Sequence, residues 1–159
     1  VGKGSIMDHA QETFISSTFW TERVGFVAAL ETIRQMQNRN TPDHLIHIGG
    51  IISSKWKLLF KKHNLNFKVT EFLPLITFKP DYGNINNEIL TYFTQEMLDR
   101  GYLAASSIYL SGCHTEKIID DYMKNVDDVL GTLSRKLNAG CISDSLRTSP
   151  REDGFRRLT

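Results

Sequence analysis

Four segments of the chain carry apolar residues at the spacing of an α-helix. The first spans Thr21 to Gln37, and Ala28 and Ala29 broaden its apolar stripe, so we expect this stripe to be the buried face of a helix. Asn38-Arg39-Asn40 ends the pattern. The residues of the stripe recur every three positions: Val24, Val27, Leu30, Ile33 and Met36.

A second segment begins at Thr41-Pro42-Asp43, which predicts a helix with Thr41 as its N-cap and Pro42 at the first helical position. Gly49 and Gly50 fall inside this helix. A glycine there costs about 1 kcal/mol against alanine, and such a pair permits close packing or a bend. The predicted apolar stripe consists of Leu45, Ile48, Ile52, Trp56, Leu59 and Phe60.

The third and fourth helical segments lie in the second half of the chain. The third runs from about Asn86 to Arg100, and Gly101 is placed to end it. Thr115 is the predicted cap of the fourth, a long helix that Gly140 ends. The inward residues of the third are predicted to be Ile89, Leu90, Phe93, Met97 and Leu98, and those of the fourth Ile119, Tyr122, Val126, Leu130, Leu133 and Leu137.

Short runs of β-branched and aromatic residues lie between these helices. Leu65–Phe72 and Leu75–Lys79 are predicted strands, with Pro74 between them, and Tyr102–Leu110 is predicted to hold a short strand and a loop. Few strands, many helices and no βαβ alternation predict an α+β fold. In this fold the helices pack on one face of a small antiparallel sheet.

The composition excludes several classes of protein. The 159 residues carry a formal net charge of +1, which favours neither nucleic acid nor a membrane surface as a partner. No apolar run approaches the ~20 residues that span a bilayer, and the first residues do not resemble a signal peptide. Cys113 and Cys141 are too few for a disulfide framework, so we expect reduced thiols in a cytoplasmic protein.

Two groups of residues invite a chemical interpretation that the sequence does not support. His44 and His47 lie three positions apart on a predicted helix and could share a metal, but two surface histidines are favoured because no further ligand set accompanies them. Ser111, Cys113 and His114 lack the Gly-x-Ser-x-Gly context of a hydrolase nucleophile. We therefore assign no catalytic and no metal-binding residue.

Three adjacent hydroxyl residues, Ser16, Ser17 and Thr18, precede the first predicted helix. The N-terminus of a helix offers unpaired N–H groups and a partial positive charge, so hydroxyls at this place suit a phosphate group. Serine and threonine also cap helices for structural reasons alone. The pattern by itself leaves both interpretations open.

Six motifs that occur in order along the chain carry a family resemblance. They are Gly4–Asp8, Thr13–Arg23, Ala28–Ile33, Phe93–Leu98, Arg100–Ala104 and His114–Asp120. Together they resemble the class III aminotransferases, pyridoxal 5′-phosphate (PLP) enzymes of fold type I, and most of all the glutamate-1-semialdehyde aminomutase-like branch. The resemblance extends from Val1 to about Leu137.

This resemblance implies a domain organisation. Residues 21–140 correspond to the C-terminal small domain of a fold type I PLP enzyme. Residues 1–20 correspond to a remnant that links it to a large PLP-binding domain. Residues 141–159 match no part of the family and combine Ser, Asp, Pro and Gly with four arginines, so we expect a disordered tail; an anion-binding tail is the alternative.

The resemblance also implies cofactor contacts. Thr18 matches a threonine that reaches the PLP phosphate of the neighbouring subunit, and Ser17 is the adjacent contact. The family's usual form is a Gly-Thr pair followed by Gly-Asn-Pro, whereas here Phe19 and Trp20 follow Thr18. The hydroxyl is kept and small residues are replaced. A homodimer that acts on a small-molecule amino donor and acceptor is implied as well.

The Schiff-base lysine of the family lies upstream of the segment that corresponds to Gly2–Ser5, and therefore before Val1. We expect this chain to be the C-terminal part of a PLP-dependent aminotransferase or aminomutase, and to be catalytically incomplete by itself. The alternative is a non-enzymatic dimerisation or binding domain derived from the same fold.

Overall fold

The computed structural model describes residues 2–13, 22–152 and 154. The chain divides into two compact units, Val1–Arg39 and Asn40–Thr159, and each is described by itself. The sequence led us to expect a boundary between residues 20 and 21. The division falls instead after the first long helix.

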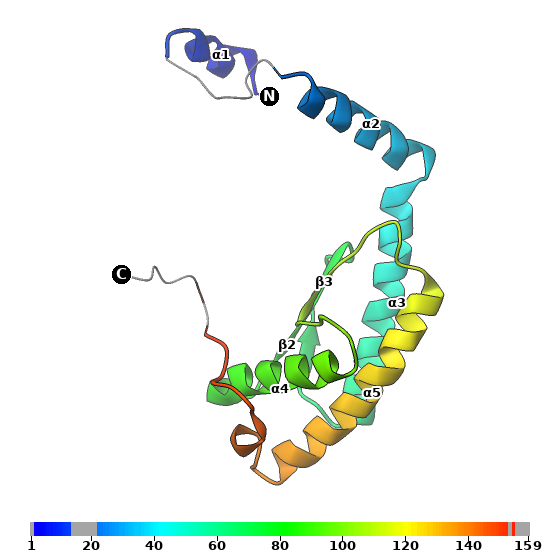
Figure 1. Ribbon diagram of the computed structural model, residues 1–159, viewed down its shortest axis with the longest axis vertical. Coiled ribbons are helices and arrows are strands. Elements are labelled where there is room, and N and C mark those ends of the chain that lie inside the picture. Colours follow the sequence, from blue (N-terminus) through cyan, green and yellow to red (C-terminus); the bar gives the residue numbers. More distant parts are fainter. Residues whose placement is uncertain (1, 14–21, 153, 155–159) are drawn as a thin grey trace. The chain divides into compact units, whose positions relative to one another are not determined.

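The first unit is helical. It holds α1 (Gly4–Met7), a 3-10 turn (Asp8–Gln11) and α2 (Val24–Asn38). Figure 1 labels the two helices and draws this part of the chain in blue. α2 begins three positions after its predicted start at Thr21. Its predicted stripe is 39–70% exposed and none of its residues is buried, so the expected burial is wrong for this chain. Amphipathicity shows that a helix face needs a partner without showing which chain supplies it.

A three-stranded antiparallel sheet organises the second unit, with β2 (Leu75–Pro80) between β1 (Phe67–Val69) and β3 (Ser107–Tyr109). Val69 lies opposite Phe78, and Ile76 lies opposite Ile108. β1 is shorter than the predicted strand. Beyond its end the N–H of Thr70 donates to the carbonyl of Thr77 (2.8 Å), but the N–H of Thr77 donates to the side-chain hydroxyl of Thr70 (3.0 Å).

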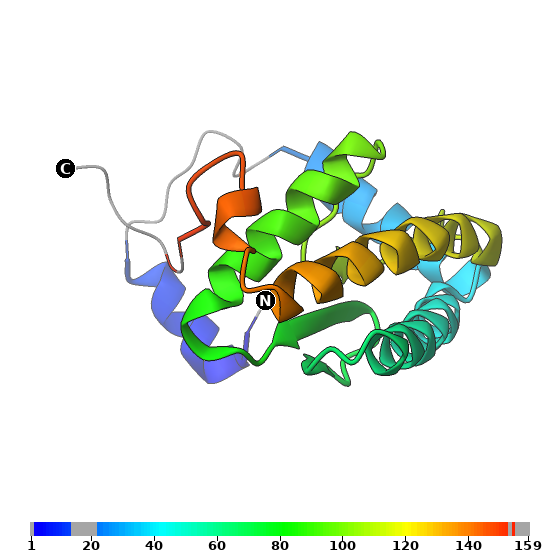
Figure 2. The same ribbon diagram turned by 90° about the horizontal axis from the view of Figure 1, so that it is seen from below.

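The helices of the second unit cover one face of this sheet. Phe78 of β2 contacts Trp56 of α3 (Thr41–Lys62) and Phe93 of α4 (Asn86–Asp99), so both helices lie on the face to which Phe78 points. Figure 2 shows α4 and α5 (Glu116–Asn138) on the same side of the sheet. The predicted α+β fold, with helices on one face of a small antiparallel sheet, is confirmed.

α3 buries most of its predicted apolar stripe and begins one position away from the prediction. Thr41 is its first residue and not its N-cap. Asn40 occupies the cap in the left-handed conformation (φ 48°), and its side-chain amide donates to Asp43 (2.7 Å). Pro42 fits the first turn, where its missing N–H would have no partner. The stripe residues that are fully buried are Ile48, Ile52, Trp56 and Phe60.

Gly49 lets α3 approach the segment that leads into β2. A Cβ atom at this position would lie 2.3 Å from the carbonyl oxygen of Leu73, which no real contact allows. A Cβ at Gly50 would meet nothing within 4 Å. Close packing therefore explains the glycine at position 49, whereas nothing in the structure explains the one at position 50.

The ends of α4 and α5 follow the sequence signals. The Thr115 hydroxyl accepts a hydrogen bond from the Ile118 N–H (3.3 Å), as expected of an N-cap. Gly101 and Gly140 follow the two helices with positive φ of 83° and 65°. Leu98, predicted to face inward, is 54% exposed, and Tyr92 is buried in its place.

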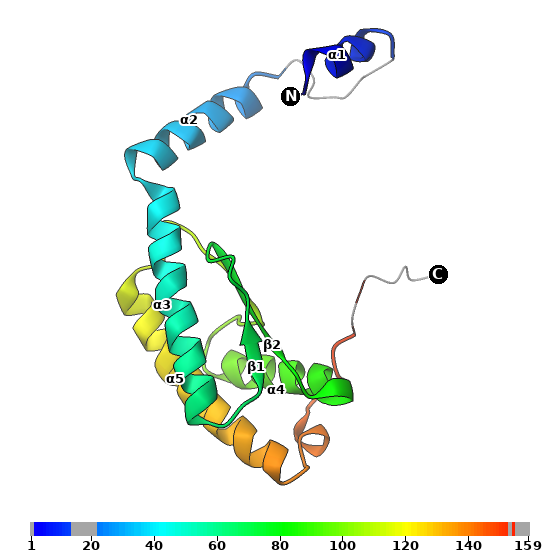
Figure 3. The same cartoon turned by 180° about the vertical axis from the view of Figure 1, so that it is seen from behind.

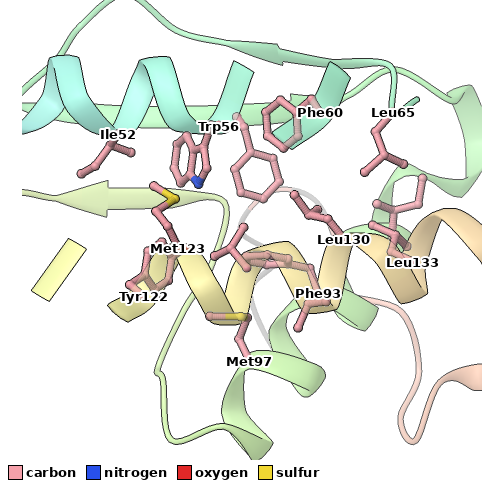
Figure 4. Packing of buried hydrophobic residues seen from close by; sticks show 14 of the residues in the cluster. Ile52, Trp56, Phe60, Leu65, Phe93, Met97, Tyr122, Met123, Leu130 and Leu133 are labelled. Atoms are coloured by element: carbon pink, nitrogen blue, oxygen red, sulfur yellow. The ribbon is translucent and has the colours of Figure 1, made fainter. Parts of the chain in front are cut away.

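The core is rich in aromatic rings. Figure 4 shows Trp56 and Phe60 of α3 facing Met123 and Leu130 of α5, with Phe93 close by. The rings of Trp56 and Phe78 meet edge to face with centroids 5.0 Å apart, and those of Phe78 and Phe93 do so at 5.2 Å. Such pairs favour one packing geometry, so the three helices and the sheet form a well-defined body.

Packed structure continues beyond residue 140, where we expected the domain to give way to a disordered tail. Ile142 is buried in the core. The side-chain amide of Gln95 on α4 donates to the carbonyl of Ser145 (2.9 Å) and accepts from the N–H of Arg147 (3.1 Å). The Arg147 guanidinium pairs with the Asp99 carboxylate. The prediction of a disordered tail rested on the average composition of the segment, which does not show that these few residues hold it against the domain.

Candidate functional site

The predicted cofactor contacts, Ser17 and Thr18, lie outside the described residues. The structure does locate the helix that was expected to support them. α2 begins at Val24, six positions after Thr18, and Arg23 at its N-cap makes no side-chain capping bond. The dipole and free N–H groups of a helix act within its first turn. The N-terminus of α2 lies too far along the chain from Thr18 for its first turn to act on a phosphate there, so this helix supports the predicted phosphate site less than the sequence pattern does.

A hollow of about 340 Å³ is lined by the β3 segment and by the N-terminal half of α5; we call it the β3–α5 hollow. Three tyrosines line it, namely Tyr102, Tyr109 and Tyr122, together with His114 and aliphatic side chains. Of the described residues, no lysine, arginine, aspartate or glutamate lines this hollow. It is an uncharged, largely apolar cavity with a few polar atoms.

His114 is fixed at the edge of this hollow by the loop that precedes α5. The backbone N–H of Ser111 donates to Nδ1 of His114 (3.0 Å), and the Ser111 hydroxyl lies 3.1 Å from the same atom. An Nδ1 that accepts an N–H carries no proton, so the neutral ring holds its proton on Nε2. Nδ1 is not free to serve Ser111 as a base, and the geometry gives this group a structural role.

Tyr122 is the most enclosed polar residue of the hollow. It is 7% exposed, and its ring meets that of Tyr102 edge to face at 5.6 Å. Burial raises the pKa of the Tyr122 hydroxyl, so it remains protonated. Within the described part of the chain this hydroxyl has no hydrogen-bond partner. No pattern in the sequence indicates this, because Tyr122 appears there only as one member of an apolar helix stripe.

α3 and α5 run parallel, side by side, as Figure 3 shows, and polar pairs join them along their length. Lys55 pairs with Asp120 at 3.1 Å, and Lys62 pairs with Asp127 at 2.6 Å. His63 also reaches Asp127, at 2.6 Å. The hydrogen bond from Lys62 is the main cause that lowers the pKa of Asp127, and the bond from His63 adds to it. These pairs fix the register of the two helices.

The two histidines considered as metal ligands have separate partners. His44 donates from Nε2 to the carbonyl of His114 (2.9 Å), and Nε2 of His47 lies 2.8 Å from the Glu116 carboxylate. The structure therefore does not bring them to a common point. Over the described ranges, no group of three or more His, Cys, Asp or Glu residues is arranged to hold a metal ion.

A PLP site needs a lysine beside a cavity that can hold the cofactor ring. Lys55, Lys62 and Lys124 are all engaged with aspartates on α5. Lys3 is exposed. No lysine among the described residues faces the β3–α5 hollow. The described residues therefore do not form a PLP site by themselves, and we derive no catalytic step through the cofactor.

Comparison with family models and with curated proteins finds no match for this chain. None of the described helices combines the length and the hydropathy needed to cross a membrane. Among solved structures, the FumI protein of Sphingopyxis sp. MTA144, in its PLP internal aldimine form, has a similar fold. The TM-score is 0.77 over 92% of this chain, at 19% sequence identity. This chain spans about a third (34%) of the length of that protein. It thus has the fold of one part of a PLP-bound protein.

Proposed function

We propose that this chain is the C-terminal small domain of a PLP-dependent class III aminotransferase or aminomutase of the glutamate-1-semialdehyde aminomutase-like branch. The observation that carries the proposal is the fold, which over 92% of the chain is similar to about a third of a protein in its PLP internal aldimine form. The six ordered motifs between Gly4 and Asp120 support the narrower class.

In this proposal the intact enzyme is a cytoplasmic homodimer that transfers an amino group to, or within, a substrate with an aldehyde or keto group. PLP supplies the electron sink for that chemistry. The hydroxyl of Thr18 donates a hydrogen bond to the cofactor phosphate across the subunit boundary, and Ser17 is the adjacent contact. The Schiff-base lysine belongs to a part of the enzyme outside this chain.

Borohydride trapping tests the proposal. The 159-residue chain and the full-length protein that contains it are each incubated with PLP and reduced, and peptides are searched for pyridoxyl-lysine. We expect one stoichiometric adduct in the full-length protein, outside this chain, and none in the chain alone. A single-site adduct with turnover in the chain alone, or no adduct in the full-length protein, would contradict the proposal.

The second candidate function is a non-enzymatic dimerisation or binding domain derived from the same fold. The unburied stripe of α2 supports a binding role, because five large apolar side chains on one helix need a protein surface to cover them; either a partner chain or the rest of an enzyme can supply that surface. The coding sequence around this chain distinguishes the two functions. A preceding segment with the lysine motif favours the enzyme, and its absence favours the binding domain.

A further inference from the structure

The first compact unit, Val1–Arg39, has no buried residue among those that the structure describes. Apolar side chains outside the stripe of α2 are open as well, since Ile6 and Phe26 are 66% and 68% exposed. A segment of this length does not offset the entropy of ordering its backbone unless it buries apolar surface. The unit therefore depends on a surface that lies outside it.

The apolar stripe of α2 does not follow one side of the helix. Its residues recur every three positions, whereas an α-helix advances by about 100° per residue. Each step of three residues therefore falls about 60° short of a full turn, and from Val24 to Met36 the stripe moves about 240° round the helix. Its side chains are 39–70% exposed along the whole of this path.

A single partner helix does not cover a stripe of this form. Two helices that pack along a seam carry apolar residues every 3.5 positions on average, because only this spacing keeps the seam facing the partner. A helix whose apolar residues point in several directions is instead enclosed in a larger body. The cover of α2 must therefore be a surface built from several elements, and a second copy of α2 offers only one helix.

The similar solved structure indicates which body supplies that surface. The shared fold leaves out 8% of this chain, about 13 of its 159 residues, whereas α2 alone has 15, so at least part of α2 belongs to the shared fold. About two thirds of that PLP-bound protein have no counterpart in this chain. In a protein of that length, α2 is accompanied by a body large enough to enclose it.

We propose that α2 packs inside the PLP-binding part of the full-length enzyme, which covers its apolar side chains on more than one side. This assignment rests on the proposed function and names the partner surface of α2. By its packing, α2 then belongs to the PLP-binding part and not to the small domain. The division of the chain after Arg39 is the boundary between these two parts of the enzyme.

Hydrogen exchange tests this assignment without any use of PLP. The same peptides are followed in the 159-residue chain and in the full-length protein that contains it. We expect the amides of α2 to exchange roughly 100-fold or more slowly in the full-length protein, because an open helix has become a buried one. The amides around Trp56, which is buried in the second unit, should be protected in both proteins. Equal protection of α2 in the two proteins would overturn the proposal.

Leu30→Ser tests the apolar contact itself. Leu30 on α2 and Leu58 on α3 are both 67% exposed, so Leu58→Ser is the matched control. In the 159-residue chain, Leu30→Ser should leave the urea midpoint unchanged, since the core lies in the second unit. In the full-length protein it should raise the unfolding equilibrium constant roughly 30-fold or more, as for a leucine truncated in a core, and Leu58→Ser should not. Equal effects of the two variants in the full-length protein would overturn the assignment.

Two further results separate the alternatives. A dimer of the 159-residue chain in which α2 is protected, and which Leu30→Ser converts to monomer, would show that a second copy covers α2 and would overturn the proposal. A full-length protein that forms the pyridoxyl-lysine adduct but leaves α2 unprotected would overturn this inference and leave the proposed function standing. The absence of the adduct contradicts the proposed function whatever the exchange of α2.

Discussion

The two adjacent glycines of α3 give a sharp test of the packing, because the same substitution should have opposite effects at them. Alanine is favoured over glycine inside a helix by about 1 kcal/mol at either position. At Gly50 an added Cβ meets nothing within 4 Å, so Gly50→Ala should stabilise the domain by up to about 1 kcal/mol.

At Gly49 the added Cβ would lie 2.3 Å from the carbonyl oxygen of Leu73 and 2.8 Å from its carbonyl carbon. These are backbone atoms, which no side-chain rotation can move. Overpacking costs about 1–3 kcal/mol, and we take the upper value for a backbone clash. After the gain of about 1 kcal/mol in helix propensity, Gly49→Ala should destabilise the domain by about 2 kcal/mol.

Urea unfolding of the 159-residue chain measures both effects. The two variants should differ by about 3 kcal/mol, which at a slope of 1–3 kcal/mol per M separates their midpoints by at least about 1 M. The slope itself should not change. If Gly49→Ala unfolds at or above the wild-type midpoint, the close approach of α3 to Leu73 is refuted.

Three further predictions concern ion pairs and the cofactor. The pKa of Asp127 is lowered in the folded chain, so its contribution to stability is present above the unfolded pKa of about 3.9 and is lost as the pH falls through the lower folded pKa. Asp127→Asn should therefore make the free energy of unfolding depend less on pH across that acid range. An unchanged dependence on pH would argue against the ion pair. Arg147→Ala should release the residues after Gly140 from α4 and speed their cleavage in limited proteolysis, whereas equal cleavage rates would show that Arg147 does not hold them. In the full-length enzyme, Thr18→Val should weaken PLP binding roughly 10- to 150-fold, as expected for the loss of a hydrogen bond to a charged group. Thr18→Ser keeps the hydroxyl and should retain most of the affinity. Unchanged affinity in the valine variant would show that Thr18 has no cofactor role.

The positions of the helices and strands in the second unit could be predicted from caps, turns and apolar periodicity in the sequence. The residues whose burial was predicted wrongly have a local explanation. At 100° per residue, Leu98 lies half a turn round α4 from Ile89, so it faces away from the core although it falls within an apolar run. Tyr92 lies near Ile89 and Phe93 on the helix circumference and is buried with them. The run of apolar residues predicts that Leu98 is buried, whereas the angular position round the helix predicts that Tyr92 is buried.

The site could be predicted less well than the fold. The β3–α5 hollow combines residues from two segments whose mutual position depends on the sheet and on the contact of α5 with the core. A lone tyrosine such as Tyr122 has the same pattern in the sequence whether its hydroxyl is paired or not. The exposure of the apolar stripe of α2 could not be predicted, because the periodicity of a helix does not specify which surface covers its apolar face.

The parallel arrangement of α3 and α5 has a consequence for how the domain forms. Parallel helices cannot be joined by a short turn, and here the pair from Lys62 to Asp127 closes a loop of 65 residues that contains the whole sheet and α4. Until α5 has left the ribosome, the aromatic rings of Trp56 and Phe60 have no covering helix. Folding of the second unit therefore waits for the synthesis of α5, and a chain cut before α5 would expose the core and aggregate.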